Sequence, residues 1–274
     1  MLTSECFAFG RDFGIQMFNL TTNFNMENES SINHSTPPDA KHLLSAGVLR
    51  VLVACEESDE VRSRLESLGW DAWSCDLQPN RNPKAKHFQC SVDDIINGYY
   101  ECECGFIHEE STGKYGCCGV SKLKTWDMLI AFPPCTHLAV SGAAYFKQKQ
   151  ESGVQQEAID FFLKLANADI KHIAIENPVG IMSKHFRKPD QIIHPYYFGD
   201  EARKKTCLWL KNLPPLKHLK EPNLFDSEVT HVSQGKIVNG YPAWMFNNDK
   251  KHRSKTFPGI AEAMAVQWSS YACR

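Results

Sequence analysis

The segment "VLRVLVACEESDEVRSRLESLGWDAWSCDL", residues 48–77, decides the fold, because it joins two apolar runs through a helical pattern. The run from Val48 is typical of a buried strand. Apolar residues then recur at helical spacing and predict a helix over Glu57–Leu68, which Gly69 ends. "WDAWSCDL" predicts a second strand, with Asp76 at its carboxyl end.

The same alternation continues along the chain. "DMLIAF" (127–132) and "IKHIAIENP" (170–178) are typical of strands, and a helix is predicted between them over Gln155–Ala168. Strands that alternate with helices indicate a parallel sheet covered on both faces. We therefore predict an α/β fold with a doubly wound sheet.

Polar residues collect at the carboxyl ends of the predicted strands. Glu56 and Glu57 follow the first strand, Asp76 the second, Cys135 the strand "DMLIAF", and Glu176 lies in "IAIENP". One acidic residue in such a place is more often a helix cap than a ligand. In doubly wound sheets, however, ligands bind beyond the carboxyl ends of the strands, so four such ends predict a binding crevice.

Composition indicates a folded protein that works in a reducing compartment. The 274 residues are 42% hydrophobic and 11% aromatic, and no apolar run is long enough to span a membrane. The 11 cysteines are an odd number, and the N-terminus has no secretory signal pattern. We expect a cytoplasmic protein with reduced thiols, which leaves Cys135 free for chemistry.

The net charge of -2 conceals an uneven distribution. Residues 184–255 contain 14 Lys and Arg against 7 Asp and Glu, whereas the remainder contains 16 against 25. A basic segment on an acidic body is expected of a phosphate-binding face, although a solvated charged surface explains it equally well.

Two motifs resemble those of the DNA (cytosine-5)-methyltransferases. "PPCTHLAVSG" resembles the nucleophile loop of that family, and "IAIENP" resembles its Glu-Asn motif. With "ACEES" and "FPPCT", the chain is similar to the short phage and prophage members, over about residues 48–268. The resemblance implies a Rossmann-like sheet of the S-adenosylmethionine-dependent methyltransferase type, with DNA as the partner.

The chemistry of cytosine methylation accounts for this pair of motifs. A thiolate at Cys135 is suited to attack C6 of a flipped cytosine. Glu176, kept neutral in a dry pocket, would donate a proton to N3. "YYFGDEARKKTCLWL" resembles a degenerate form of the basic motif of the family, and Arg203 or Lys205 is expected to reach the cytosine or its phosphate.

The donor loop departs from the family. Closely spaced glycines usually follow the first strand, but "ACEESDE" has none. Glu56, Glu57 and Ser58 would then contact the donor through their side chains, or the donor is not S-adenosylmethionine.

The remaining donor contacts are assigned from position and resemblance. Asp76 is expected to bind the ribose hydroxyls, because it lies about 20 residues after the first strand–helix turn. Asp93 would meet the adenine, with Asp94 an equal candidate, and Pro133 completes the donor-side set.

The predicted organisation has four parts. Residues 1–46 form a flexible arm, 47–212 the catalytic domain, 213–255 a small target-recognition segment, and 256–274 a helix that returns to the sheet. An insertion at 98–122 is rich in cysteine. Cys102, Cys104, Cys117 and Cys118 are predicted to bind a structural zinc ion, although their spacing is unusual and free thiols are the alternative.

Three functions remain open from the sequence. The first is a DNA cytosine C5-methyltransferase acting on cytoplasmic, nucleoid DNA. The second is a related enzyme that modifies C5 of a free nucleotide or uses another donor, which the missing glycines favour. The third is a catalytically silent DNA-binding relative. The oligomeric state and the target sequence cannot be predicted.

Overall fold

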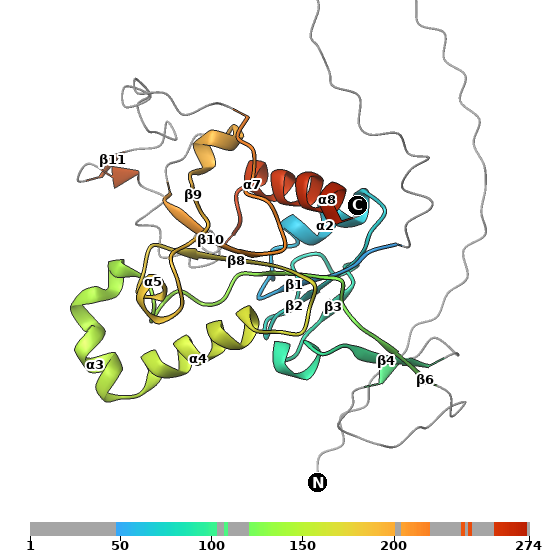
Figure 1. Cartoon of the computed structure of the whole chain (residues 1–274), viewed down its shortest axis with the longest axis horizontal. Coiled ribbons are helices and arrows are strands. Elements are labelled where there is room, and N and C mark those ends of the chain that lie inside the picture. Colours follow the sequence, from blue (N-terminus) through green and yellow to red (C-terminus); the bar gives the residue numbers. More distant parts are fainter. Residues whose placement is uncertain are drawn as a thin grey trace, which may run out of the picture. The chain divides into compact units, whose positions relative to one another are not determined.

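The computed structural model describes residues 48–102, 107–108, 121–200, 204–219, 237–238, 241–242 and 255–272. Their centre is a seven-stranded sheet in the order β3-β2-β1-β7-β8-β10-β9 (Figure 1). The strands are β1 (Arg50–Ala54), β2 (Asp71–Cys75), β3 (His87–Phe88), β7 (Met128–Ala131), β8 (His172–Pro178), β9 (Gln191–Ile193) and β10 (Thr206–Lys211).

Six of these strands run in one direction and one is reversed. β1 pairs in parallel with β2 and β7, β2 with β3, and β7 with β8. β10 is antiparallel to both β8 and β9, so β9 has the same direction as the others. The predicted doubly wound, Rossmann-like sheet is confirmed.

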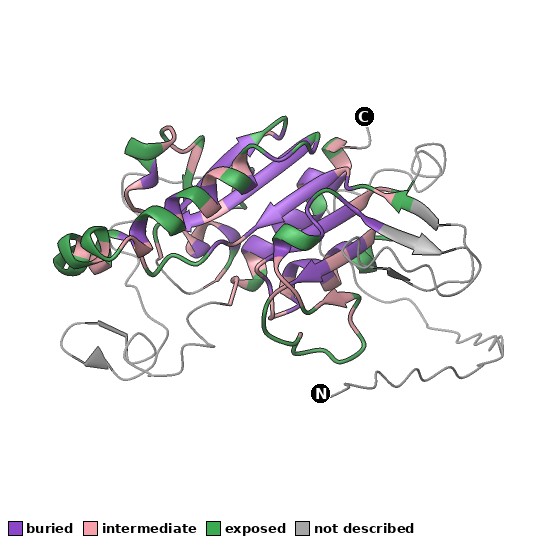
Figure 2. Cartoon of the chain, turned by 90° about the horizontal axis from the view of Figure 1, so that it is seen from below, coloured by how far each residue is buried: buried purple, intermediate pink, exposed green. Residues whose placement is uncertain are grey.

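Alternation of side chains along the strands gives the sheet two apolar faces. Val51 and Val53 of β1 lie in one core, and Leu52 and Ala54 lie in the other. The central strands β1, β7, β8 and β10 are largely buried, whereas the helices expose their outer surfaces (Figure 2). Such continuous apolar runs are expected of a sheet covered on both faces.

Different helices cover the two faces. The first core contains residues of α2 (Glu60–Ser67), α7 (Pro258–Ala263) and the π-helical turn η7 (Met264–Trp268), and Ala272 of α8 (Ser269–Ala272) packs against it. The second contains α4 (Val154–Ala166), whose buried Ile159, Phe162 and Leu165 recur at helical spacing. Figure 1 shows α2, α7 and α8 on one side of the sheet and α4 on the other.

Smaller elements complete the described part of the chain. A three-stranded antiparallel sheet has the order β5-β4-β6, and β11 pairs with β12. The bounds are β4 (Tyr99–Cys102), β5 (Ile107–His108), β6 (Ser121–Lys124), β11 (Ile237–Val238), β12 (Tyr241–Pro242), α3 (Phe146–Glu151), α5 (Met182–His185), and the 3-10 turns η1 (Val92–Asp94), η3 (Val140–Tyr145) and η4 (Pro195–Phe198).

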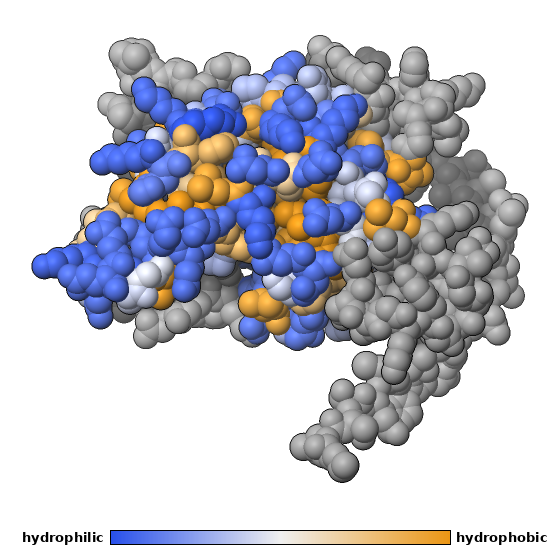
Figure 3. Space-filling model, turned by 60° about the horizontal axis from the view of Figure 1, so that its bottom comes forward, coloured by the Kyte–Doolittle hydropathy of each residue, from blue (hydrophilic) through white to orange (hydrophobic). Residues whose placement is uncertain are grey.

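The helices match the sequence prediction except at their ends. The helix predicted over Glu57–Leu68 is α2, which begins at Glu60, and the one predicted over Gln155–Ala168 is α4. Hydrophilic side chains cover much of the face shown in Figure 3, with apolar patches between them. Among the described residues, no helix has both the length and the apolar character needed to cross a bilayer. The predicted domain boundaries stay predictions, and residues 1–46 lie outside the described part.

Candidate active site

The loop that carries Cys135, the predicted nucleophile loop, leaves the sheet at the carboxyl end of β7. Phe132 donates its backbone N–H to Ala54 O, and Pro133 and Pro134 then turn the chain away. The carbonyl oxygen of Cys135 accepts the N–H groups of Leu138 and Ala139, at 3.0 and 2.9 Å, and closes a tight turn. This turn holds Cys135 at the exposed edge of the sheet.

The loop after β8 is bonded to the nucleophile loop. Val140 N donates to Val179 O and Ile181 N donates to Leu138 O, both at 3.0 Å. Gly180 lies at the closest approach, where a Cβ atom would overlap Leu138 O and lie 2.9 Å from the Leu138 carbonyl carbon. The loop that carries Cys135 and the segment that follows Glu176 therefore form one unit.

Asn177 ties the two segments together from within the sheet. Its side chain is buried, and Nδ2 donates to Pro133 O at 2.8 Å. Its Oδ1 has no hydrogen-bond partner among the described residues. The Pro-Pro-Cys and Glu-Asn-Pro motifs, 41 residues apart from Cys135 to Glu176, thus meet at one edge.

Glu176 lines a narrow cavity of about 20 Å³, which has room for about one water molecule. Burial raises the pKa of Glu176 above its ordinary value, against the opposing effects of the Lys204 ammonium and the Thr206 hydroxyl. A raised pKa favours the neutral carboxylic acid, which can donate a proton. The cavity is lined by Phe132, Glu176, Lys204, Thr206, Lys255, Thr256, Phe257 and Ile260.

The thiol of Cys135 shares this electrostatic environment. Partial burial, followed by the charge of Glu176, raises the pKa of Cys135, whereas the Lys204 ammonium lowers it. The charge of Lys204 therefore acts on both groups, and the charge of Glu176 acts on Cys135. A buried acid beside a thiol at a strand end is an arrangement found at catalytic sites.

The basic residues before β10 do not all face the Glu176 cavity. Lys204 lines the Glu176 cavity, whereas Lys205 is exposed. Arg203 lies outside the described residues. Lys204 was not singled out from the sequence, because three consecutive basic residues do not reveal which one faces inward. Lys255 and Thr256 were missed for a different reason, since only the fold brings them beside β8.

On the donor side, the ends of β1 and β2 and the turn η1 converge. Burial, followed by the charges of Asp76 and Asp93, raises the pKa of Cys55 to about 12. Asp93 also pairs with Lys164 of α4 at 2.9 Å, across a largely exposed contact. Asp94 is exposed. Asp76 and Asp93 are therefore the acids that face the end of β1.

Residues other than glycine take left-handed conformations in the loop after β1. Cys55 has φ 60° and Asp59 has φ 65°, in the region where glycine is the usual residue. Cys55 N and Glu56 N both donate to Cys75 O, at 2.7 and 3.2 Å, and hold the loop against β2. Cys55 and Asp59 thus adopt backbone conformations that glycine usually supplies, in a loop that contains no glycine.

Glu56 caps α2 from within the protein. Its buried carboxylate accepts Val61 N at 2.7 Å and Arg62 N at 3.2 Å. Burial raises the pKa of Glu56 to about 7, even though these two N–H groups and the Arg62 charge lower it. An acidic group at a helix N-terminus is stabilised by the helix dipole. Glu56 therefore fills a position where a bound anion would otherwise lie.

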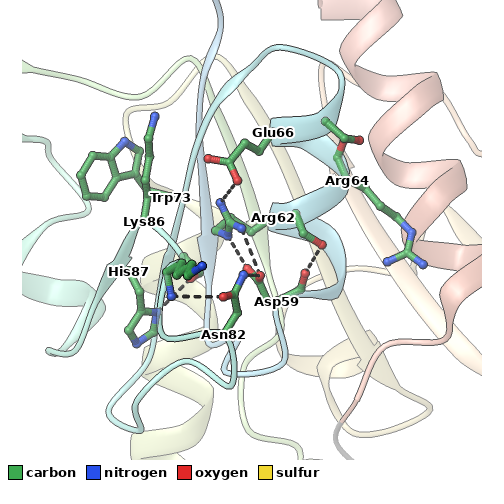
Figure 4. Close-up of polar contacts among 12 residues, drawn as sticks. Asp59, Arg62, Arg64, Glu66, Trp73, Asn82, Lys86 and His87 are labelled. Atoms are coloured by element: carbon green, nitrogen blue, oxygen red, sulfur yellow. Dashed lines mark hydrogen bonds and ion pairs between the residues drawn. The ribbon is translucent and has the colours of Figure 1, made fainter. Parts of the chain in front are cut away.

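A polar network fixes the neighbouring β2–β3 loop (Figure 4). Arg62 is almost fully buried and forms ion pairs with Asp59 and, at 2.8 Å, with Glu66. Asn82 Nδ2 donates to Asp59 Oδ2 at 2.9 Å. Glu57, one of the predicted donor contacts, forms an ion pair at 2.7 Å with Arg81 of the β2–β3 loop. Ser58 is partly buried beside them.

These residues fit part of S-adenosylmethionine. Asp76 is partly exposed at the end of β2, and Asp93 faces the same place, so carboxylate acceptors are available for a ribose and an adenine amino group. The loop after β1 fits less well, because Glu56 already occupies the first N–H groups of α2. The nucleoside portion therefore has a matching set of residues, and the anionic end of the donor does not have one at α2.

The predicted zinc site cannot be located. Cys104, Cys117 and Cys118 lie outside the described residues, and for Cys102 only the backbone is described. Within the described ranges, no group of three or more histidine, cysteine or acidic residues could hold a metal ion.

A larger cavity of about 480 Å³ lies on the α4 side of the sheet. Its walls include Ile173, Phe186, Arg187 and Trp209, and none of the residues discussed above as catalytic or donor-binding lines it. The polar groups at the rim are already bonded, as Arg187 is to Asp190 at 2.6 Å. The candidate active site is therefore the smaller cavity, which Glu176 lines.

Comparisons with known proteins find similarity to solved structures alone. No protein family matches the chain, and no curated protein is significantly similar to it. A solved structure with similarity is an E. coli protein encoded within a prophage and described as a proposed DNA modification methyltransferase. The two share 15% sequence identity with a TM-score of 0.36, over 59% of this chain and 46% of the other. The chain thus spans less than half the length of that neighbour.

Proposed function

We propose that this chain is a DNA cytosine C5-methyltransferase, with Cys135 as the nucleophile and Glu176 as the acid. The observation that carries the proposal is the joining of their two loops. Asn177 Nδ2 donates to Pro133 O, and the residues after Cys135 and Glu176 exchange backbone hydrogen bonds. A thiol and a carboxyl group whose pKa is raised are thereby held at one edge of a Rossmann-like sheet, where ligands bind.

The two residues have complementary tasks. The Cys135 thiolate forms a bond from Sγ to C6 of cytosine, and the C5–C6 π electrons shift toward C5. Glu176 donates its proton to N3, so that the ring does not accumulate negative charge. C5 then becomes nucleophilic. The raised pKa of Glu176 supports this role, because the acid must remain protonated at neutral pH.

S-adenosylmethionine would supply an electrophilic methyl group when bound at this edge. Asp76 would accept hydrogen bonds from the ribose hydroxyls, and Asp93 would accept one from the adenine amino group. Pro133 and Phe132 would limit access of water from the β7 side. Basic residues of the 184–255 segment would contact DNA phosphates, and residues 213–255 would read the sequence around an extruded base.

A covalent-trapping experiment tests the proposal. DNA containing 5-fluorocytosine should form a stable covalent complex with the protein when S-adenosylmethionine is present, because fluorine cannot leave C5 as the proton does. Cys135→Ser should abolish the complex, and Glu176→Gln should slow its formation strongly. Cys207→Ser is a matched control, because Cys207 is a buried thiol on the opposite face of β10 from Lys204 and Thr206. Trapping that persists in Cys135→Ser would overturn the assignment.

A second candidate function is favoured by the loop after β1. The carboxylate of Glu56 already accepts the first N–H groups of α2, which an anionic group of the donor would otherwise use. This arrangement suits a different donor, or a free nucleotide as the substrate. Labelled methyl transfer to DNA and to deoxycytidylate separates the two candidates. Mass spectrometry of nucleosides from cells that express the chain would identify any group added to cytosine.

A further inference from the structure

Gln155 is a polar residue at an apolar position of α4. The buried residues of this helix recur at helical spacing, and they are Gln155, Ile159, Phe162 and Leu165. The last three lie in the second core, and Gln155 itself is only 3% exposed. A buried amide costs free energy unless it is hydrogen-bonded, whereas an apolar residue at this position would carry no such cost. The bond that Gln155 makes is therefore the reason to look for a role.

That bond reaches the turn that carries Cys135. Gln155 Nε2 donates to His137 O at 3.1 Å, across 18 positions of the sequence. From α3, Lys149 Nζ donates to Thr136 O at 2.6 Å, in an exposed contact. The two carbonyl groups that follow Cys135 in the chain thus accept hydrogen bonds from side chains of α3 and α4.

The opposite side of the same turn is bonded to β8 and to the loop after it. Asn177 Nδ2 donates to Pro133 O at 2.8 Å, and Ile181 N donates to Leu138 O at 3.0 Å. Gln155 adds a buried donor from α4 to these bonds. The turn is consequently held between a strand and a helix, and α4 holds it through the amide of Gln155.

We infer that Gln155 is a positioning residue, which fixes the turn after Cys135 through its hydrogen bond to His137 O. The inference rests on the proposed role of Cys135 as the nucleophile. Gln155 acts through the turn and not on the reacting atoms, since Cys135 O accepts the N–H groups of Leu138 and Ala139 directly after His137. A shift of His137 therefore moves the backbone that carries the thiol. A misplacement of about 1 Å can slow a reaction roughly a hundredfold.

Substitutions at Gln155 test whether the donated hydrogen bond matters. Gln155→Met keeps a side chain of similar length and removes the N–H donor. Covalent trapping on 5-fluorocytosine DNA should slow roughly tenfold or more, with unchanged affinity for DNA, because Gln155 is buried. Gln156→Met is the matched control. Gln156 is the next residue of α4, is exposed, and donates to Asp160 Oδ1 of the same helix at 2.8 Å.

Gln155→Glu gives a signature that a role in packing alone would not produce. A carboxylate has no donor for His137 O, whereas a protonated carboxylic acid has one O–H group. The trapping rate of Gln155→Glu relative to the unmodified protein should therefore recover as the pH falls from about 8 to about 5. The relative rate of Gln155→Met should stay constant over the same range.

Hydrogen exchange measures the turn itself and needs neither DNA nor donor. The amides of Leu138 and Ala139 are protected by their bonds to Cys135 O. In Gln155→Met, peptides that cover residues 136–142 should exchange several-fold faster, and in Gln156→Met they should exchange as in the unmodified protein. Thermal unfolding shows whether each variant retains the fold, and Gln155→Leu provides a second apolar variant if Gln155→Met is unstable.

The outcomes separate this inference from the proposed function. Equal exchange rates in Gln155→Met and Gln156→Met overturn the inference, as does unchanged trapping in Gln155→Met. A loss of trapping in Gln155→Glu that is the same at every pH also contradicts it. Faster exchange in Gln155→Met, together with no trapping by the unmodified protein, would support the hold of Gln155 on the turn and contradict methyl transfer.

Discussion

The side-chain amide of Asn177 donates a hydrogen bond of 2.8 Å to the carbonyl oxygen of Pro133, two residues before Cys135. The strand that carries Glu176 therefore fixes the turn that carries the thiol. Asn177 is buried, so this bond is protected from competition by water. The position of Cys135, the proposed nucleophile, depends on this bond.

Replacement of Asn177 by alanine should damage both stability and chemistry. The carbonyl of Pro133 would lose its partner, at a cost of about 1–3 kcal/mol in the free energy of unfolding. Covalent trapping on 5-fluorocytosine DNA should fall by more than the loss of folded protein explains. Asn167→Ala is the control, because its bond to Leu163 O lies at an exposed position. Equal losses in both variants would argue against a positioning role.

Gly180→Ala should separate the loop that carries Cys135 from the loop that follows β8. A methyl group at this position overlaps Leu138 O, so the backbone pairing of Val140 with Val179 must open or shift. Strain of this kind typically costs about 1–3 kcal/mol, and trapping should be nearly lost. Gly153→Ala is matched, because Gly153 has φ 81° but nothing within 4 Å of a Cβ atom. Urea unfolding and trapping rates of the two variants distinguish local strain from the effect on the site.

Asp93 and Asp94 should differ in their contribution to donor binding. Both residues are exposed, but the charge of Asp93 acts on Cys55 at the end of β1, whereas Asp94 is not among the charges that do. Asp93→Asn and Asp76→Ala should each weaken binding of S-adenosylmethionine roughly tenfold, and Asp94→Asn should not. Titration calorimetry provides the measurement. No binding by the unmodified protein, with or without DNA, would make another donor the leading hypothesis.

Glu56 should make the protein less stable as the pH rises. Its folded pKa of about 7 lies above the ordinary value of 4.5, so the folded state holds the proton more tightly than the unfolded state. The contribution of Glu56 to the free energy of unfolding should therefore be greatest below about pH 4.5 and should decline as the pH rises toward 7. Glu56→Gln should remove this decline, which is on the order of 1–3 kcal/mol.

Thermal unfolding at pH 5 and pH 8 measures the difference for Glu56→Gln. The variant should gain stability relative to the unmodified protein as the pH rises. Glu57→Gln provides the comparison at a partly exposed acid that is paired with Arg81. Parallel pH profiles for the unmodified protein and Glu56→Gln would contradict the effect of burial on Glu56.

The sheet was predictable because strand and helix periods alternate clearly between residues 48 and 178. The reversal of β10 was not, since the apolar run "TCLWLK" is equally compatible with either direction. Two short sequence motifs also sufficed to predict that Cys135 and Glu176 belong to one site. The choice between Lys204 and Lys205 required the register of β10 on β8.

Glu56 shows a second limit of sequence reasoning. An acidic residue in a loop is expected to contact solvent or a ligand, and it was assigned to the donor. Glu56 is buried because the end of β1 lies close to the first turn of α2. That distance is known only once the backbone has folded. The left-handed conformation of Asp59, which gives α2 no side-chain cap of its own, leaves that task to Glu56.

The helical segment α7–η7–α8 has a consequence for how the chain is made. Its buried Ile260, Met264 and Trp268 cover the same face of the sheet as α2, beside β1, although they are synthesised after every strand. While the ribosome is still translating residues 258–268, α2 covers that face of the sheet only in part. Completion of the core must therefore wait until this last segment has left the exit tunnel, and the nascent chain is a natural client for chaperones during that interval.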